Sequence, residues 1–184
     1  MAQNKNTTQS IVLIVAHDGF RDEEYAEPLE IFKENGYSVK TASSSPTNAT
    51  GNFGLQAKVD LLVKNINVKE FAAIVFVGGP GAAEYFTDRQ AHNVIKDAYK
   101  NNIIVAAICI APNILANAGI LEGKKATCWD SENLIKRKVN YTGNSVERDG
   151  LIITGKNPQA AKSFAQLIVT AIKGNEILQN VNLE

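Results

Sequence analysis

The sequence predicts a single α/β domain in which helices cover both faces of a mostly parallel sheet. Its 184 residues suit one domain with a sizeable core. Continuous aliphatic runs have the pattern of strands that are buried on both faces, and these runs span 11–16, 71–77 and 103–108. Helical stretches separate the runs, and strands that alternate with helices imply parallel pairing.

The first half of the chain begins with the strand over 11–16. A helix over 22–35 follows it, and Gly36 ends this helix as a C-terminal cap would. The segments that come next are a strand over 37–43, a polar loop over 44–52, an extended, hairpin-like stretch over 55–63 and the buried strand over 71–77.

The second half continues the alternation of helices and strands. It is expected to contain a helix over 89–101, a strand over 103–108, a helix over 112–118, an extended segment over 125–128 and a helix over 131–139 with Ser131 as its N-cap. Asp149 and Gly150 lie between two apolar runs, which predicts a hairpin over 146–154. An amphipathic helix over 160–172 completes a flavodoxin-like sandwich.

The domain is therefore expected to span 11–174, between a polar N-terminal extension over 1–10 and a C-terminal tail over 175–184. Lys and Arg together number 19, as do Asp and Glu, so the balanced charge favours neither nucleic acid nor an anionic membrane as a partner. The first ten residues lack the apolar core of a signal peptide, and the most apolar run, 103–111, is too short to cross a bilayer. With only two cysteines, a disulfide scaffold is not expected either. These features predict a cytoplasmic protein.

In an open parallel sheet, ligands bind outside the carboxyl ends of the strands, which directs attention to 17–24, 78–81 and 109–112. Cys109 follows the strand over 103–108 directly, and Pro112 suits the first turn of the next helix. Such a strand-to-helix junction is a nucleophile elbow, and the start of the helix is expected to lower the pKa of the thiol. Because free cysteines are also among the most buried residues, core packing remains an alternative.

A carboxyl group is expected beside this junction. Pro28 lacks the N–H that would bond to the carbonyl of Glu24, so the helix is perturbed there and the Glu24 side chain can turn into the crevice. The neighbouring acids Asp22 and Glu23 are interpreted as residues that favour the positive end of a helix, and from the residues alone the same role is an alternative for Glu24.

Glycines follow the strand over 71–77, where they let backbone amides approach a ligand closely. Neither a P-loop nor a dinucleotide-binding fingerprint is present. The amides of Gly79 and Ile110 are therefore interpreted as halves of an oxyanion hole, with a simple tight turn as the alternative.

Four motifs in register resemble the ThiJ/PfpI superfamily, the group of the Parkinson's-disease protein deglycase and the PfpI-type intracellular proteases. The motifs span 22–28, 78–79, 107–112 and 146–154, and the resemblance extends over 11–172. It implies that Cys109 is the nucleophile, that Glu24 hydrogen-bonds its thiolate and that Gly79 contributes to an oxyanion site. It also implies a homodimer.

The histidines of the superfamily are missing. Ile110 takes the place of the histidine that follows the nucleophile in PfpI-type proteases, and Trp129 replaces another histidine near the cysteine. His17 ends the first strand and is expected, like Trp129, to line the pocket, whereas His92 is expected to be solvated. Hydrolysis of amides by a Cys-His pair is therefore not favoured.

Three functions remain open. The first is a cofactor-independent enzyme that acts on small reactive carbonyls, as glyoxalases and deglycases do. The second is an intracellular cysteine peptidase or amidase, and the third is a redox-sensing stress-response protein in which Cys109 oxidises. No cofactor is expected, and no metal, because the cysteines and histidines lack ligand spacing. Cys128 is interpreted as core packing.

Overall fold

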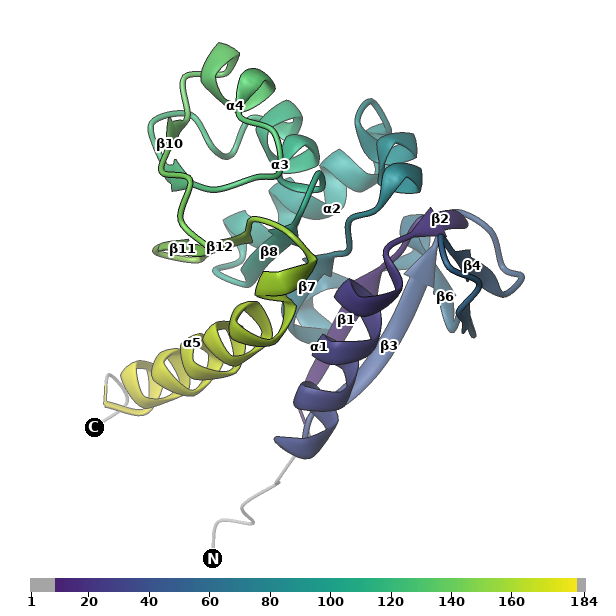
Figure 1. Ribbon diagram of the computed structural model, residues 1–184. Helices are drawn as coiled ribbons and strands as arrows, with labels where there is room; N and C mark the ends of the chain where they lie inside the picture. The colour runs from purple at the N-terminus through teal and green to yellow at the C-terminus, as the bar shows by residue number, and fades with distance from the viewer. Residues whose placement is uncertain (1–8, 182–184) are drawn as a thin grey trace, which may run out of the picture.

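A seven-stranded sheet forms the centre of the computed structural model, which describes residues 9–181 (Figure 1). In order across the sheet, its strands are β11 (Val146–Asp149), β12 (Ile152–Gly155), β8 (Ile104–Ile108), β7 (Phe71–Phe76), β1 (Ser10–Ile14), β3 (Ser38–Ser43) and β6 (Leu61–Leu62). All neighbours pair in parallel except β11 and β12, which form the expected hairpin around Gly150 at φ +62°. The predicted fold class is thus confirmed.

Both faces of the sheet are buried, which explains why its strands are continuously aliphatic. On β1, Ile11 and Leu13 belong to one core layer, and Val12 and Ile14 belong to the other. All four side chains are fully excluded from solvent. Two apolar layers therefore surround the sheet, as expected for parallel strands.

Helices lie on each face (Figure 1). The first layer is formed by α1 (Asp22–Glu34) and α5 (Ala161–Val181), which pack against each other. The second is formed by α2 (Arg89–Lys100) and α3 (Pro112–Ala118), and α4 (Glu132–Lys136) packs beside α3. Short 3-10 helices occur at Val63–Asn65, Val68–Glu70, Pro80–Tyr85 and Pro158–Ala160.

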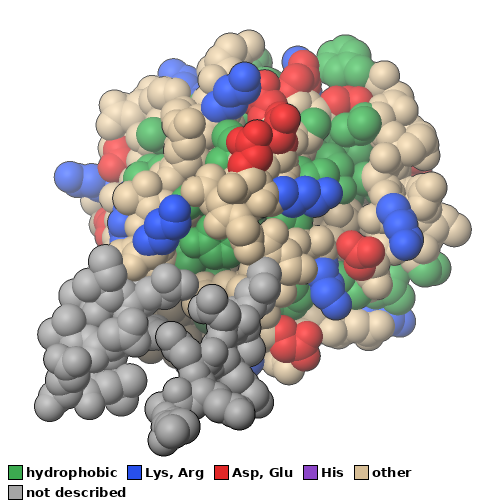
Figure 2. All heavy atoms as spheres, turned by 90° about the horizontal axis from the view of Figure 1, so that it is seen from below, with side chains coloured by type: hydrophobic (Ala, Val, Ile, Leu, Met, Phe, Trp, Pro, Cys, Tyr) green, Lys and Arg blue, Asp and Glu red, His purple; other side chains and the backbone are tan. Residues whose placement is uncertain are grey.

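Two small sheets complete the fold. The strands β2 (Asp18–Phe20), β4 (Ala49–Gly51) and β5 (Gln56–Ala57) form one, and β9 (Lys125–Ala126) and β10 (Asn140–Tyr141) form the other. The first holds the segment between β1 and α1 at the carboxyl edge of the main sheet. Viewed from below, basic and acidic side chains are interspersed on the surface, in keeping with the zero net charge (Figure 2).

Some boundaries differ from those predicted. The stretch over 55–63 is divided between two sheets, because β5 pairs with β4 while β6 joins the edge of the main sheet beside β3. The helix α4 is shorter than predicted. The Ser131 side chain makes no cap hydrogen bond, and the Glu132 N–H at the start of the helix donates to Asp130 Oδ1 at 3.0 Å.

The last helix, α5, continues beyond 172 to Val181, into the segment that the sequence assigns to a C-terminal tail. The greater part of the predicted N-terminal extension, 1–8, and residues 182–184 lie outside the described residues. Among residues 9–181, no helix has both the length and the apolar character needed to cross a membrane.

Candidate active site

Cys109 occupies the elbow between β8 and α3 in a strained backbone conformation. Its φ of +61° lies in the left-handed region, which non-glycine residues rarely adopt. Three hydrogen bonds hold it there: its N–H donates to the Gly155 carbonyl at 3.0 Å, and its carbonyl accepts from the Trp129 N–H at 2.8 Å and from the Cys128 thiol at 3.0 Å. The side chain is 8% exposed, so the sulfur is recessed but reachable.

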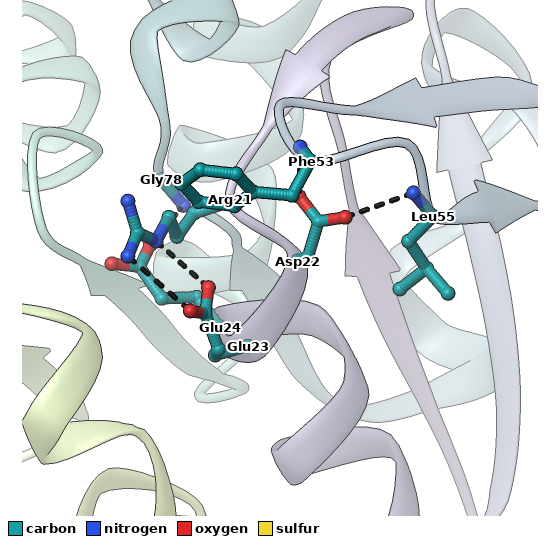
Figure 3. Close-up of polar contacts among 7 residues, drawn as sticks. All are labelled: Arg21, Asp22, Glu23, Glu24, Phe53, Leu55 and Gly78. Atoms are coloured by element: carbon teal, nitrogen blue, oxygen red, sulfur yellow. Dashed lines mark hydrogen bonds and ion pairs between the residues drawn. The ribbon is translucent and has the colours of Figure 1, made fainter.

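Glu24 meets this thiol from the first turn of α1. Its side chain is fully buried, and Oε2 accepts the Gly78 N–H at 3.0 Å (Figure 3). The carboxyl group also lies beside the Cys109 side chain, with which it interacts electrostatically, and Oε1 has no hydrogen-bond partner among the described residues. The structure therefore brings together the carboxyl and the thiol that the sequence singles out.

Glycine is required at two positions between them. A Cβ on Gly78 would overlap Glu24 Oε2 and would lie 2.7 Å from the Cys109 Cβ. Gly79 has a φ of +95°, and a Cβ there would overlap the backbone nitrogen of Arg21. The acid, the thiol and the loop after β7 can approach one another only because these side chains are absent.

Burial sets the protonation of the carboxyl. It raises the pKa of Glu24 to about 7, against the opposing effects of the Cys109 thiol, the Gly78 N–H and the Arg21 charge. The carboxyl therefore loses its proton near neutral pH, where a general acid and base is most useful.

Burial and, after it, the negative charge of Glu24 raise the pKa of Cys109 to about 12. The N–H groups of Gly79 and Ile110 point at the sulfur and oppose this rise. The expectation of a lowered thiol pKa is therefore wrong, because burial and the carboxylate outweigh the amides at the start of a short helix. At neutral pH the sulfur carries its proton, with Glu24 beside it to accept that proton.

A cavity of about 350 Å³ opens onto the thiol. Its lining consists of Arg21, Gly79, Pro80, Cys109, Ile110, Trp129, Pro158 and Gln159. Trp129 thus occupies the position expected of it, and its side chain is 60% exposed. His17 does not line this cavity, so the structure does not support its predicted place there; its backbone N–H donates to Glu84 Oε1 at 3.2 Å.

A second cavity, of about 640 Å³, adjoins the first, with which it shares Ile110 and Trp129. It is more polar, and Asp130 and Lys156 contribute opposite charges to its lining. Within residues 9–181, no group of three or more His, Cys, Asp or Glu side chains is placed to hold a metal ion.

The role of Cys128 could not be found from the sequence. Its side chain is fully buried, as the packing interpretation requires, but its thiol also donates to the Cys109 carbonyl. Asn113 Nδ2 donates in turn to Cys128 Sγ at 3.6 Å, and Asn133 Nδ2 donates to Asn113 Oδ1 at 2.9 Å. A chain of polar contacts therefore runs from α4 to the backbone of the elbow. A sequence signal was present in Asn113, a polar residue directly after Pro112.

Comparisons with known proteins show what this chain is similar to in sequence and in fold. Residues 9–171 match the model of the DJ-1/PfpI family. The chain is 36% identical over 170 residues to the protein MJ0967 of Methanocaldococcus jannaschii, covering 90% of this chain and 83% of that protein. It is 30% identical over 164 residues to the deglycase PYRAB04690 of Pyrococcus abyssi, covering 88% of this chain and 99% of that protein. A crystal structure of a ThiJ/PfpI domain protein from Brachyspira murdochii superposes with a TM-score of 0.88 at 33% identity and covers 91% of this chain and 98% of that one.

Proposed function

Because the chain belongs to the DJ-1/PfpI family, we propose that it is a cofactor-independent cysteine enzyme that acts on small reactive carbonyls, in the manner of a glyoxalase or deglycase. One observation carries the proposal: a fully buried carboxyl, with a pKa raised to about 7, lies beside the thiol at the elbow. A relative from Pyrococcus abyssi, which bears the name deglycase, supports the same class of chemistry.

In the proposed reaction, the Glu24 carboxylate accepts the thiol proton while Cys109 Sγ bonds to the aldehyde carbon of a 2-oxoaldehyde. Glu24 then returns the proton to the new alkoxide, which gives a hemithioacetal. In this proposal the amides of Gly79 and Ile110, which act on the Cys109 sulfur in the resting protein, stabilise the oxyanion that forms as the C–S bond is made.

The hemithioacetal then rearranges to a thioester. Glu24 carries a proton from the aldehyde carbon to the neighbouring carbon through an enediol, and the hydroxyl proton moves to the neighbouring oxygen, so no external oxidant is needed. Water cleaves the thioester and releases the 2-hydroxy acid and the thiol. A group that alternates between acid and base in this way works best with a pKa near the ambient pH, which is what burial of Glu24 provides.

The absence of histidine from the cavity disfavours the peptidase alternative. Neither His17 nor His92 is among its lining residues, so no imidazole is available there to protonate a leaving amine. The redox-sensor alternative requires a thiol that ionises readily, and the raised pKa of Cys109 works against it.

The test is to incubate the protein with methylglyoxal and to measure lactate. We expect turnover in the wild type, none above background in Cys109→Ala and a strongly reduced rate in Glu24→Gln. Glu30→Gln is the matched control, since Glu30 is an exposed carboxylate on the same helix, α1. Equal lactate formation by wild type and Cys109→Ala would refute the proposal, and cleavage of a fluorogenic peptide by the wild type alone would favour the peptidase instead.

A further inference from the structure

Arg21 brings a cation into the cavity of the candidate nucleophile. Among the residues that line this cavity, Arg21 alone carries a full charge. The rest of the lining consists of glycine, proline, the thiol, Ile110, Trp129 and the neutral amide of Gln159. The proton transfers proposed above do not use this guanidinium.

The backbone of Arg21 is held independently of its side chain. Its N–H donates to the Gly78 carbonyl at 2.9 Å, and its own carbonyl accepts the Tyr25 N–H at 3.2 Å. Gly79 packs directly against the Arg21 nitrogen, where a Cβ would overlap it. The side chain can therefore be changed without displacing the loop that carries Glu24.

The guanidinium group is oriented on two sides (Figure 3). Its Nε and Nη2 donate to the two carboxyl oxygens of Glu23, at 2.8 and 3.2 Å. Its face lies over the Phe53 ring, 4.5 Å from the ring centroid. Within the described residues, Nη1 makes no hydrogen bond.

The aromatic platform is itself fixed. The Asp22 carboxylate accepts the Phe53 N–H at Oδ2 and the Leu55 N–H at Oδ1, each at 2.9 Å (Figure 3). The loop after β4 is thereby tied to the first turn of α1. The guanidinium is ordered before any ligand arrives, and it retains a donor that no protein group uses.

We propose that Arg21 forms an anion subsite in the Cys109 cavity and binds the carboxylate of a ligand whose reactive carbon is at the sulfur. The substrates that follow are carbonyl compounds in which either the substrate or its product carries a carboxylate. A 2-oxoaldehyde belongs to this class because its product is a 2-hydroxy acid. This assignment of substrate rests on the proposed function, whereas the binding of anions does not.

The expected strength of the subsite is modest. The Arg21 side chain is 28% exposed and is already paired with Glu23, so part of its field is neutralised and part is screened by solvent. A single charge-assisted hydrogen bond from Nη1 is then worth about fivefold in affinity or rate.

Alkylation of Cys109 measures this effect without any need for turnover. Iodoacetate and iodoacetamide react with thiols in the same way and differ in charge. The rate with iodoacetate divided by the rate with iodoacetamide, measured at Cys109 and normalised to the same ratio for free glutathione, therefore reports the attraction of anions to the site. Mass spectrometry identifies the modified cysteine. We expect the ratio to fall about fivefold in Arg21→Gln and to be partly retained in Arg21→Lys.

Arg148→Gln is the matched control, because Arg148 is exposed, does not line the cavity and makes a side-chain hydrogen bond to the Gly150 carbonyl. Its ratio should equal that of the wild type, and thermal unfolding should show that all the variants are folded. A second measurement compares protection of Cys109 from iodoacetamide by lactate and by the neutral lactamide. Lactate should protect the wild type more strongly, and this advantage should disappear in Arg21→Gln.

The proposal is overturned if Arg21→Gln keeps both the wild-type alkylation ratio and the wild-type preference for lactate. The outcome is separable from that of the proposed function. A protein that forms no lactate from methylglyoxal yet shows the Arg21-dependent ratio refutes the enzymatic proposal and leaves the anion subsite intact. Turnover of methylglyoxal, together with an Arg21→Gln variant that keeps both the wild-type ratio and the wild-type preference for lactate, refutes the anion subsite and leaves the enzymatic proposal intact.

Discussion

The two cysteines lie close together at the carboxyl edge of the sheet, and they differ in what surrounds them. Burial raises the pKa of both thiols, to about 12 for Cys109 and about 11 for Cys128. Cys109 opens onto a cavity and contacts Glu24, whereas Cys128 is fully buried and donates to the Cys109 carbonyl. A lowered pKa therefore does not distinguish the candidate nucleophile from the structural thiol. An acidic neighbour and access from solvent do.

The largest difference between the two thiols should appear in catalysis and labelling. Cys109→Ala should reduce lactate formation from methylglyoxal about a thousandfold or more, because the bond to the substrate can no longer form. Iodoacetamide should label Cys109 and spare Cys128 in the folded protein, as peptide mapping would show. Equal labelling of both cysteines without denaturant would contradict the comparison.

The carboxyl group of Glu24 lies beside Cys109 and not beside Cys128. Removing this carboxyl group should have the next largest effect on catalysis. Glu24→Gln keeps the shape of the side chain but can no longer accept the thiol proton, so kcat should fall about a hundredfold or more. In the wild type, kcat should rise as the pH increases through about 7, because the carboxylate is the active form of the base. A pH profile that is flat between 6 and 8 would contradict the assignment of Glu24.

The same carboxyl should make the stability of the protein depend on pH. Its pKa is about 7 in the folded protein and near 4.5 when unfolded, so between these values the folded state binds more protons. Stability must therefore fall as the pH rises from about 4.5 to about 7, by about 3 kcal/mol for the full shift. Urea denaturation at pH 5 and pH 8 should show that Glu24→Gln lacks this loss. Glu30→Gln should behave like the wild type.

The smallest effect should come from Cys128, as a residue that positions the elbow. Cys128→Ala removes one donor to the Cys109 carbonyl and should lower kcat about tenfold with little change in KM. Cys128→Ser restores a donor and should recover much of the loss, although its unfolding free energy is also lowered by the buried hydroxyl. If alanine and serine lower kcat equally, the hydrogen bond has no positioning role and Cys128 is packing alone.

Local patterns located the strand-to-helix junction, and the resemblance to the ThiJ/PfpI superfamily was needed to select its acid. The aliphatic run over 103–108, the cysteine directly after it and Pro112 predict the junction, because each acts through its immediate neighbours. The spacing of Glu24 to Pro28 made it a candidate, and the family resemblance selected it. The Cys128 contact could not be predicted, since it joins the elbow to a residue 19 positions further along the chain, beyond α3 and β9.

The periodicity of apolar residues, together with the glycines and prolines that end helices and strands, thus determined the α/β class, the order of the strands along the chain and the site at the carboxyl edge. Only the tertiary structure decided which groups are desolvated together. It reversed the expected direction of the Cys109 pKa, placed Arg21 rather than His17 in the cavity and carried α5 as far as Val181. The physical reason is that a pKa and the lining of a cavity depend on the summed environment of distant segments, whereas a strand or an elbow depends on its own few residues.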